Sequence, residues 1–183
     1  YDEKLTYIGL IGRHDFVKGH DIFLKGAAEV LKKRKDVRFI IAGEGDGRAA
    51  LIELAQKLGI SQKLIFAGFI KDIYSFINFV DINTLTSRCE SFPYVLMEGA
   101  KFSKPTVSSD VGGISDLKIN RKTGFLFENE NYTQFAEKLI YLIDNKEQRE
   151  ALGNALYERA TSTFSSTSLA DTHVDIYKAI LRD

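Results

Sequence analysis

Short apolar segments alternate with amphipathic segments along the 183 residues, and this alternation limits the folds open to the chain. The apolar segments show no regular exchange of apolar and polar residues, which is typical of strands buried on both faces. Such strands are expected at residues 6–11, 37–42, 64–67, 80–85, 106–108 and 124–127. Strand–helix–strand alternation predicts an α/β fold in which a six-stranded parallel sheet carries helices on both faces.

Helical periodicity marks the segments between these strands. A first helix carries apolar residues at 22, 27, 30 and 31, and a second carries them at 51, 54, 55 and 58, with Gly59 placed to end it. Pro93 suits the first turn of a helix that runs to about residue 102. Residues 132–183 predict three successive helices, and the Ser/Thr-rich stretch 161–168 is expected to separate and cap two of them.

Composition excludes several classes of protein. Lys plus Arg and Asp plus Glu number 25 each, so the chain lacks the basic balance of a nucleic-acid-binding protein. The single cysteine, Cys89, excludes an internal disulfide and suits a reducing compartment, and we expect its thiol to be partly buried. The longest apolar run is far shorter than the roughly 20 residues that span a bilayer.

The start of the chain indicates a larger parent protein. The only methionine is Met97, and the chain opens at Tyr1. We therefore expect residues 1–183 to form a single domain excised from a longer protein.

The loop after the first expected strand carries two cations. Gly12 permits a sharp turn, and Arg13 and Lys18 then stand five residues apart before Gly19. An arginine fork and a lysine point charge around one loop can hold a diphosphate. The alternative is an ordinary solvated loop.

Glycines follow two other strands. Gly43 and Gly45 allow close backbone approach after the second strand, although a flexible loop has the same composition. Gly112 and Gly113 precede a short helix and could present backbone N–H groups to an anion, or form a plain turn.

Two acids after the fourth strand form the strongest signal. Glu90 lies on the loop, Pro93 starts a helix, and Glu98 follows about one and a half turns later, so both carboxylates can face one cleft. Carboxylates accept hydrogen bonds from vicinal sugar hydroxyls. The alternative is a pair of unrelated surface glutamates. The three histidines lack metal-ligand spacing and no cysteine cluster accompanies them, so no metal site is expected.

Together these loops resemble the donor domain of family 4 retaining glycosyltransferases. The motifs are Gly12-Arg13 with Lys18-Gly19, Gly43-Glu44-Gly45, Glu90 to Glu98, and Gly112-Gly113, which fall in the family's order and spacing across nearly the full chain. The resemblance implies a Rossmann-like domain, the C-terminal half of a GT-B fold. The resemblance further implies that the N-terminal acceptor domain of that fold is absent from this chain.

The resemblance also implies a role for each site residue. Arg13, Lys18 and Glu90 would act in catalysis: the two cations neutralise the donor diphosphate, and Glu90 contacts the transferred sugar. The donor would further be bound by the ribose-contacting Glu98, by backbone near the base at Phe69 and Ile70, and by the glycines Gly12, Gly43, Gly45, Gly112 and Gly113. One departure is visible, because the family often has glutamate where this chain has the shorter Asp116.

The implied activity is transfer of a sugar from a nucleoside diphosphate sugar, with retention of configuration and without a metal or other cofactor. The acceptor, a sugar or lipid-linked sugar, would bind the missing domain, so the fragment alone should be inactive. By analogy with bacterial members of the family, we expect a role in bacterial polysaccharide or glycolipid synthesis in the cytoplasm, at the inner face of the membrane, with peripheral membrane association of the full-length protein. Two alternatives remain: a GT-B-like nucleotide-sugar epimerase, and a non-catalytic α/β module that binds a protein.

Overall fold

The computed structural model describes residues 2–117 and 120–181. Six strands form one sheet in the order β3-β2-β1-β4-β5-β6, and every neighbouring pair is parallel. The strands are β1 (Thr6–Ile11), β2 (Val37–Ala42), β3 (Leu64–Gly68), β4 (Ile82–Leu85), β5 (Thr106–Ser109) and β6 (Phe125–Phe127). The expected α/β fold is confirmed.

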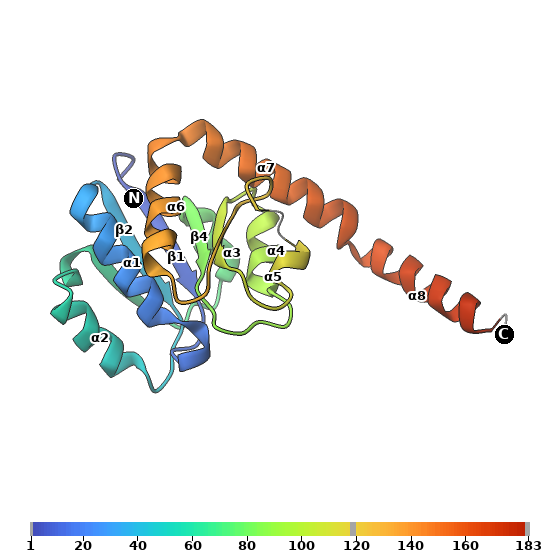
Figure 1. Cartoon of the computed structure of the whole chain (residues 1–183), viewed down its shortest axis with the longest axis horizontal. Helices are drawn as coiled ribbons and strands as arrows, with labels where there is room; N and C mark the ends of the chain where they lie inside the picture. The colour runs from blue at the N-terminus through green and yellow to red at the C-terminus, as the bar shows by residue number, and fades with distance from the viewer. Residues whose placement is uncertain (1, 118–119, 182–183) are drawn as a thin grey trace.

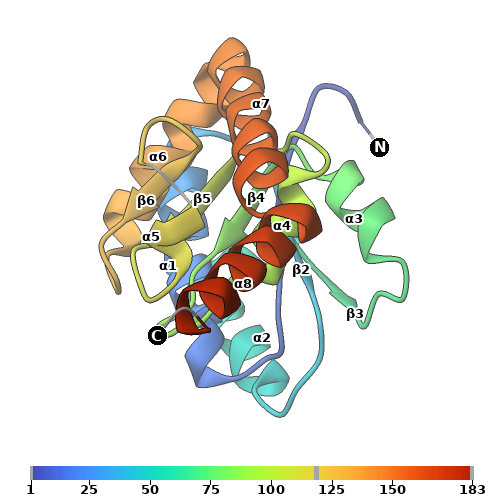
Figure 2. The same ribbon diagram turned by 90° about the vertical axis from the view of Figure 1, so that its right-hand side faces the viewer.

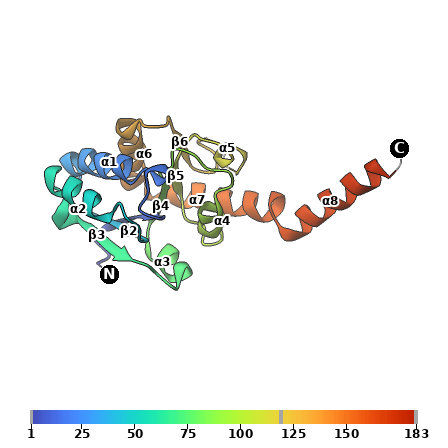
Figure 3. The ribbon, with the colours of Figure 1, turned by 90° about the horizontal axis from the view of Figure 1, so that it is seen from below.

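Helices cover both faces of the sheet (Figure 3). One face packs against α1 (His20–Lys33), α2 (Arg48–Lys57) and α6 (Tyr132–Asp144). The other face packs against α3 (Ile73–Phe79), α4 (Tyr94–Ala100), α5 (Ile114–Leu117) and α7 (Lys146–Thr163). Successive strand residues serve opposite layers: Ile8 and Leu10 belong to the first core and Tyr7 to the second.

The chain reverses direction across the sheet between β1 and β4. From β1 it winds outward through β2 to the edge strand β3, then crosses back to β4, which pairs with β1 at Ile8↔Ile82. Parallel sheets bind ligands in the crevice at such a reversal, outside the carboxyl ends of the strands. Figure 1 shows β1 and β4 in the centre of the molecule.

Helix α3 was missing from the predicted elements, and it corrects the expected fourth strand. That strand begins at Ile82 rather than at residue 80, because Val80 caps α3 and donates its N–H to the Phe76 carbonyl. The edge strand β3 also departs from the expected burial on both faces. It is only half-covered, and Ile65 is exposed.

The predicted helix ends agree closely with the structure. Gly59 follows α2 in the left-handed conformation, with a φ of 69°. Pro93 stands immediately before α4, which ends at Ala100, two residues earlier than expected. The Ser/Thr-rich stretch separates α7 from α8 (Ser166–Ile180), and the Ser165 hydroxyl caps α8 by accepting the Ser168 N–H.

The last helix projects from the body of the molecule (Figure 1), and Figure 2 shows it in front of the body. No described residue of α8 is buried. Within residues 2–117 and 120–181, the structure has no helix long and apolar enough to cross a bilayer.

Candidate functional site

The loops after β1 and β4 meet at the reversal point of the sheet. Lys18 comes from the short 3-10 helix Phe16–Lys18 in the first loop, and Glu90 from the second. The Lys18 ammonium donates to Glu90 Oε2 at 2.8 Å, and the side chains are 26% and 13% exposed. Two of the three residues predicted to act in catalysis are therefore in direct contact, although 72 residues separate them in the chain.

Lys18 and Glu90 line a hollow of 210 Å³. The end of β1, at Ile11 and Gly12, and the start of α4 also line it. The remaining lining residues are Leu85, Phe92, Pro93, Tyr94 and Val95. One ion pair on an apolar wall is an arrangement that orients a polar ligand while excluding water from part of it.

Two predicted glycines are required by close contacts between loops. Gly43 has a φ of 134°, and a Cβ there would lie 2.0 Å from the carbonyl oxygen of Gly12. Gly112 has a φ of 50°, and its Cβ would lie 1.9 Å from the carbonyl oxygen of Glu90. The adjacent Gly113 donates its N–H to that same carbonyl at 3.1 Å. Gly43 and Gly112 thus allow the strand-end loops to pack together. The Gly113 N–H, which was predicted to face an anion, donates instead to the Glu90 carbonyl.

Hydroxyl groups after β4 tie the two loops together, and the sequence interpretation missed them. Thr86 donates its hydroxyl to the Gly19 carbonyl at 2.9 Å, and Ser87 donates to Glu90 Oε2 at 3.2 Å. Ser109, at the end of β5, donates to the Ser87 carbonyl at 2.6 Å. Small polar residues directly after a buried strand were the available signal.

Comparison with known families decides the assignment. Residues 1–159 match the model of the family described as glycosyl transferases group 1. The chain belongs to the group 1 glycosyltransferases.

Individual group 1 glycosyltransferases and related structures agree with this assignment. The chain is 27% identical over 172 residues to the alpha-D-kanosaminyltransferase of Streptomyces kanamyceticus, covering 93% of this chain and 45% of that protein. It is 25% identical to the C-terminal domain of a Francisella tularensis group 1 glycosyl transferase, with a TM-score of 0.81 and coverage of 88% and 87%. Anabaena HepE, solved with UDP and glucose, shares the fold with a TM-score of 0.87 at 21% identity, covering 96% of this chain and 48% of HepE.

The match is partial in length. The chain spans less than half of the first curated relatives it matches, from 39% to 45% of each. By contrast, it matches nearly the whole of the Francisella C-terminal domain.

In this group 1 glycosyltransferase chain, Arg13 stands apart from the Lys18–Glu90 pair. Its guanidinium lies 3.3 Å from Asp15, and the side chain is 83% exposed. Arg13 and Gly45 line a separate cavity of 540 Å³ between the β1 loop and the start of α2. The structure therefore does not bring Arg13 into the 210 Å³ hollow.

Three predicted donor-binding residues, Phe69, Ile70 and Glu98, are not among the residues that line the hollow. Phe69 is 74% exposed after β3, with its N–H 3.4 Å from a Glu44 carboxylate oxygen, and Ile70 packs against the α3 layer. Glu98 is half-buried on α4 outside the residues that line the hollow, and burial raises the pKa of its carboxyl. The side chain of Asp116 lies outside the described part of the chain.

Two histidines form an unpredicted buried pair beside the Arg13 cavity. The rings of His14 and His20 meet edge to face, with centroids 5.1 Å apart, and both residues line that cavity. Desolvation by burial, with the neighbouring His14, lowers the pKa of His20 to about 4. In the described residues, no three His, Cys, Asp or Glu side chains gather closely enough to hold a metal ion.

The expectation for Cys89 was wrong. Its thiol is exposed, because its neighbour Arg88 takes the inward position on this loop. The Arg88 side chain is only 12% exposed.

Proposed function

We propose that this chain is the donor-binding half of a retaining glycosyltransferase that transfers sugar from a nucleoside diphosphate sugar. The observation that carries the proposal is the Lys18–Glu90 ion pair at the reversal point of the sheet. It places a cation, which can bind phosphate, beside a carboxylate, which can accept hydrogen bonds from hydroxyls. A nucleoside diphosphate sugar carries both phosphate and hydroxyl groups. The family match and the fold shared with the UDP-bound HepE support this choice of ligand.

Lys18 supplies the charge that the leaving group needs. An ammonium has three donors, so one can stay on Glu90 while the others face phosphate oxygens. As the sugar C1–O bond breaks, its electron pair goes to the diphosphate, and a nearby cation stabilises that charge. An acceptor hydroxyl forms the new bond to C1, and its proton leaves with the diphosphate. Arg13, exposed at the same sheet edge, adds a second cation.

Glu90 orients the sugar. Its Oε2 accepts hydrogen bonds from Lys18 and from the Ser87 hydroxyl, which hold that oxygen in place. We assign the other oxygen, Oε1, to hydroxyls of the transferred sugar, and Glu98 to the ribose. Because Lys18 and Arg13 provide the positive charge, we propose that transfer needs no divalent metal or other cofactor.

We further propose that a second half binds the acceptor, a sugar or lipid-linked sugar. The curated relatives are more than twice as long as the matched region. Helix α8 exposes an apolar stripe, formed by Leu169, Ile176 and Ile180, which that half would cover. The isolated chain should then transfer no sugar. Its one cysteine agrees with a cytoplasmic enzyme, and its acceptor could bring it to the membrane surface.

A thermal-shift panel of UDP, GDP and ADP and their glucose conjugates, with and without Mg²⁺, tests the donor assignment. A ligand at 100 times its Kd stabilises by about 2.7 kcal/mol, which raises the Tm of a domain this size by roughly 5–10 °C. We expect one diphosphate to give such a shift without Mg²⁺. Lys18→Ala should remove it.

The matched control is Lys57→Ala, which removes an exposed lysine that is also ion-paired, to Glu53 on α2. It should leave the shift intact. The proposal fails if no nucleotide stabilises the folded chain, or if Lys18→Ala responds like Lys57→Ala.

A further inference from the structure

We propose that Arg88 is a positioning residue that holds the Lys18 loop and the Glu90 loop in the geometry that binds the donor. The inference rests on the proposed function, since it concerns the same site. Arg88 lies two residues before Glu90 and does not line the 210 Å³ hollow. Its action on the ligand would therefore pass through the loops that it joins.

The guanidinium of Arg88 contacts the first turn of α1 through an ion pair and the loop after β1 through a carbonyl. Its two terminal nitrogens donate to the two carboxylate oxygens of Asp21 at 2.9 and 3.0 Å, in the bidentate geometry that suits arginine. One of them also donates to the Phe16 carbonyl at 2.7 Å. Burial alone would raise the pKa of Asp21, but hydrogen bonds from Arg88 and Lys25 hold it below its ordinary value.

The contacts with Phe16 and Val17 fix the backbone just before Lys18. The Arg88 guanidinium lies 4.0 Å from the centre of the Phe16 ring, and the Arg88 N–H donates to the Val17 carbonyl at 2.7 Å. The main chain and the side chain of Arg88 thus both contact the short 3-10 helix that ends in Lys18. A shift of this helix relative to Glu90 would separate the 2.8 Å ion pair.

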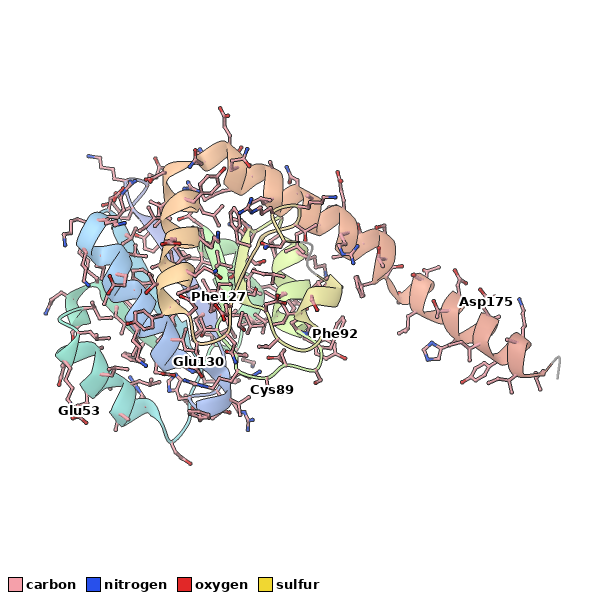
Figure 4. The ribbon with its side chains drawn as sticks, viewed as in Figure 1. Glu53, Cys89, Phe92, Phe127, Glu130 and Asp175 are labelled. Atoms are coloured by element: carbon pink, nitrogen blue, oxygen red, sulfur yellow. The ribbon has the colours of Figure 1, made fainter. Side chains whose placement is uncertain are left out.

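A third loop completes the arrangement. Glu130, between β6 and α6, accepts hydrogen bonds from Arg88 Nε and from a terminal nitrogen. Its backbone φ is 67°, which is uncommon for a residue other than glycine. Figure 4 shows Glu130 close to Cys89, the residue that follows Arg88, at this edge of the sheet.

Only an arginine fits this position. Its planar fork serves two carboxylates and stacks on Phe16 at the same time, whereas a lysine ammonium is a point charge. The neighbouring Cys89 and Glu90 are then oriented outward and toward Lys18, respectively.

The test compares Arg88→Ala with Arg34→Ala by calorimetric titration of UDP, or of the diphosphate that the panel identifies, at a temperature where both variants are folded. Arg34 is the matched control because it also pairs with two acids, Asp36 and Asp144, but near the opposite end of α1. We expect Arg88→Ala to raise the Kd at least about tenfold, since small displacements of positioning groups have large effects. Arg34→Ala should change it less than about twofold, and Arg88→Lys should fall between them.

Hydrogen exchange gives a readout that needs no ligand. Arg88→Ala should accelerate exchange of residues 12–19, 86–93 and 128–131, while Arg34→Ala should not. If Lys18→Ala weakens UDP binding but Arg88→Ala does not, the positioning role is overturned and the donor assignment stands. If UDP does not bind the wild-type chain, the donor assignment fails, and unchanged exchange in these three segments overturns the positioning role by itself.

Discussion

At the scale of single residues, the buried histidine pair shows how a site-bearing loop depends on protonation. His14 and His20 are 2% and 1% exposed, and His14 also packs edge to face on Phe66. Burial lowers the pKa of both imidazoles, and Arg48 lowers that of His14 further while Glu44 opposes it. Both rings are therefore neutral at neutral pH, so protonating either would bury a charge between the β1 loop and the start of α1.

Acidification should destabilise the fold through His20. Its folded pKa of about 4 lies below the 6.5 of the unfolded chain. The contribution of neutral His20 to stability is therefore fully present above pH 6.5 and is lost as the pH falls toward 4. The shift corresponds to about 3 kcal/mol across that window. The free energy of unfolding, measured by urea denaturation between pH 4 and 7, should depend less steeply on pH for His20→Gln than for the wild type. The control, His173→Gln, changes an exposed histidine on α8 and should keep the wild-type dependence of the unfolding free energy on pH.

At the scale of elements, close packing between helix and loop outweighs helix propensity. Gly153 lies in the middle of α7, where alanine would be the better helix former by about 1 kcal/mol. A Cβ there would lie 1.8 Å from the carbonyl oxygen of Ser103, in the turn between α4 and β5. This glycine sets how closely α7 approaches that turn, and so how α7 covers α4.

Gly153→Ala should therefore destabilise the protein, although propensity alone predicts the reverse. Overpacking against a backbone atom costs typically 1–3 kcal/mol, so we expect a net loss of about 2 kcal/mol in chemical denaturation. The matched variant Asn154→Ala changes the adjacent, exposed residue of the same helix. It should be neutral or slightly stabilising, and equal stability of the two variants would contradict the packing argument.

At the scale of the whole molecule, α8 stands apart from the folded body (Figure 1). Three of its exposed apolar residues, Leu169, Ile176 and Ile180, recur at helical spacing and form one stripe, and Asp171 and Asp175 lie on the opposite side. Val174 and Tyr177, also exposed on α8, lie outside this stripe. Helices of this length are marginal in water without a packing partner. The stripe is thus available to the second half that we propose.

Deleting residues 166–183 should leave the rest of the chain intact. Because no described residue of α8 is buried, we expect the Tm by circular dichroism to change by less than about 2 °C. In a domain of this size, a loss of about 1 kcal/mol of stability would lower the Tm by more than this. Nucleotide binding by the truncated chain should also be unchanged. A large drop in Tm would show that α8 packs on the body in solution.

The sequence by itself determined the sheet, most helices and the positions of the strand-end loops. Hydrophobic periodicity and glycine or proline at element ends are local properties, so residues such as Gly59 and Pro93 could be interpreted without knowing their neighbours. The sequence also placed Lys18 and Glu90 at the carboxyl ends of their strands. It missed α3, a short helix whose seven residues give little room for periodicity.

Only the tertiary structure decided which loops meet. The order β2-β1-β4 brings residues 18 and 90 together, and no local pattern encodes which strands become neighbours. The same order turns Arg88 inward toward Asp21 and leaves Cys89 exposed, the reverse of what the cysteine's character indicated. Such contacts depend on long-range packing, because the free energy of each one is realised only when distant segments of the chain are already in place.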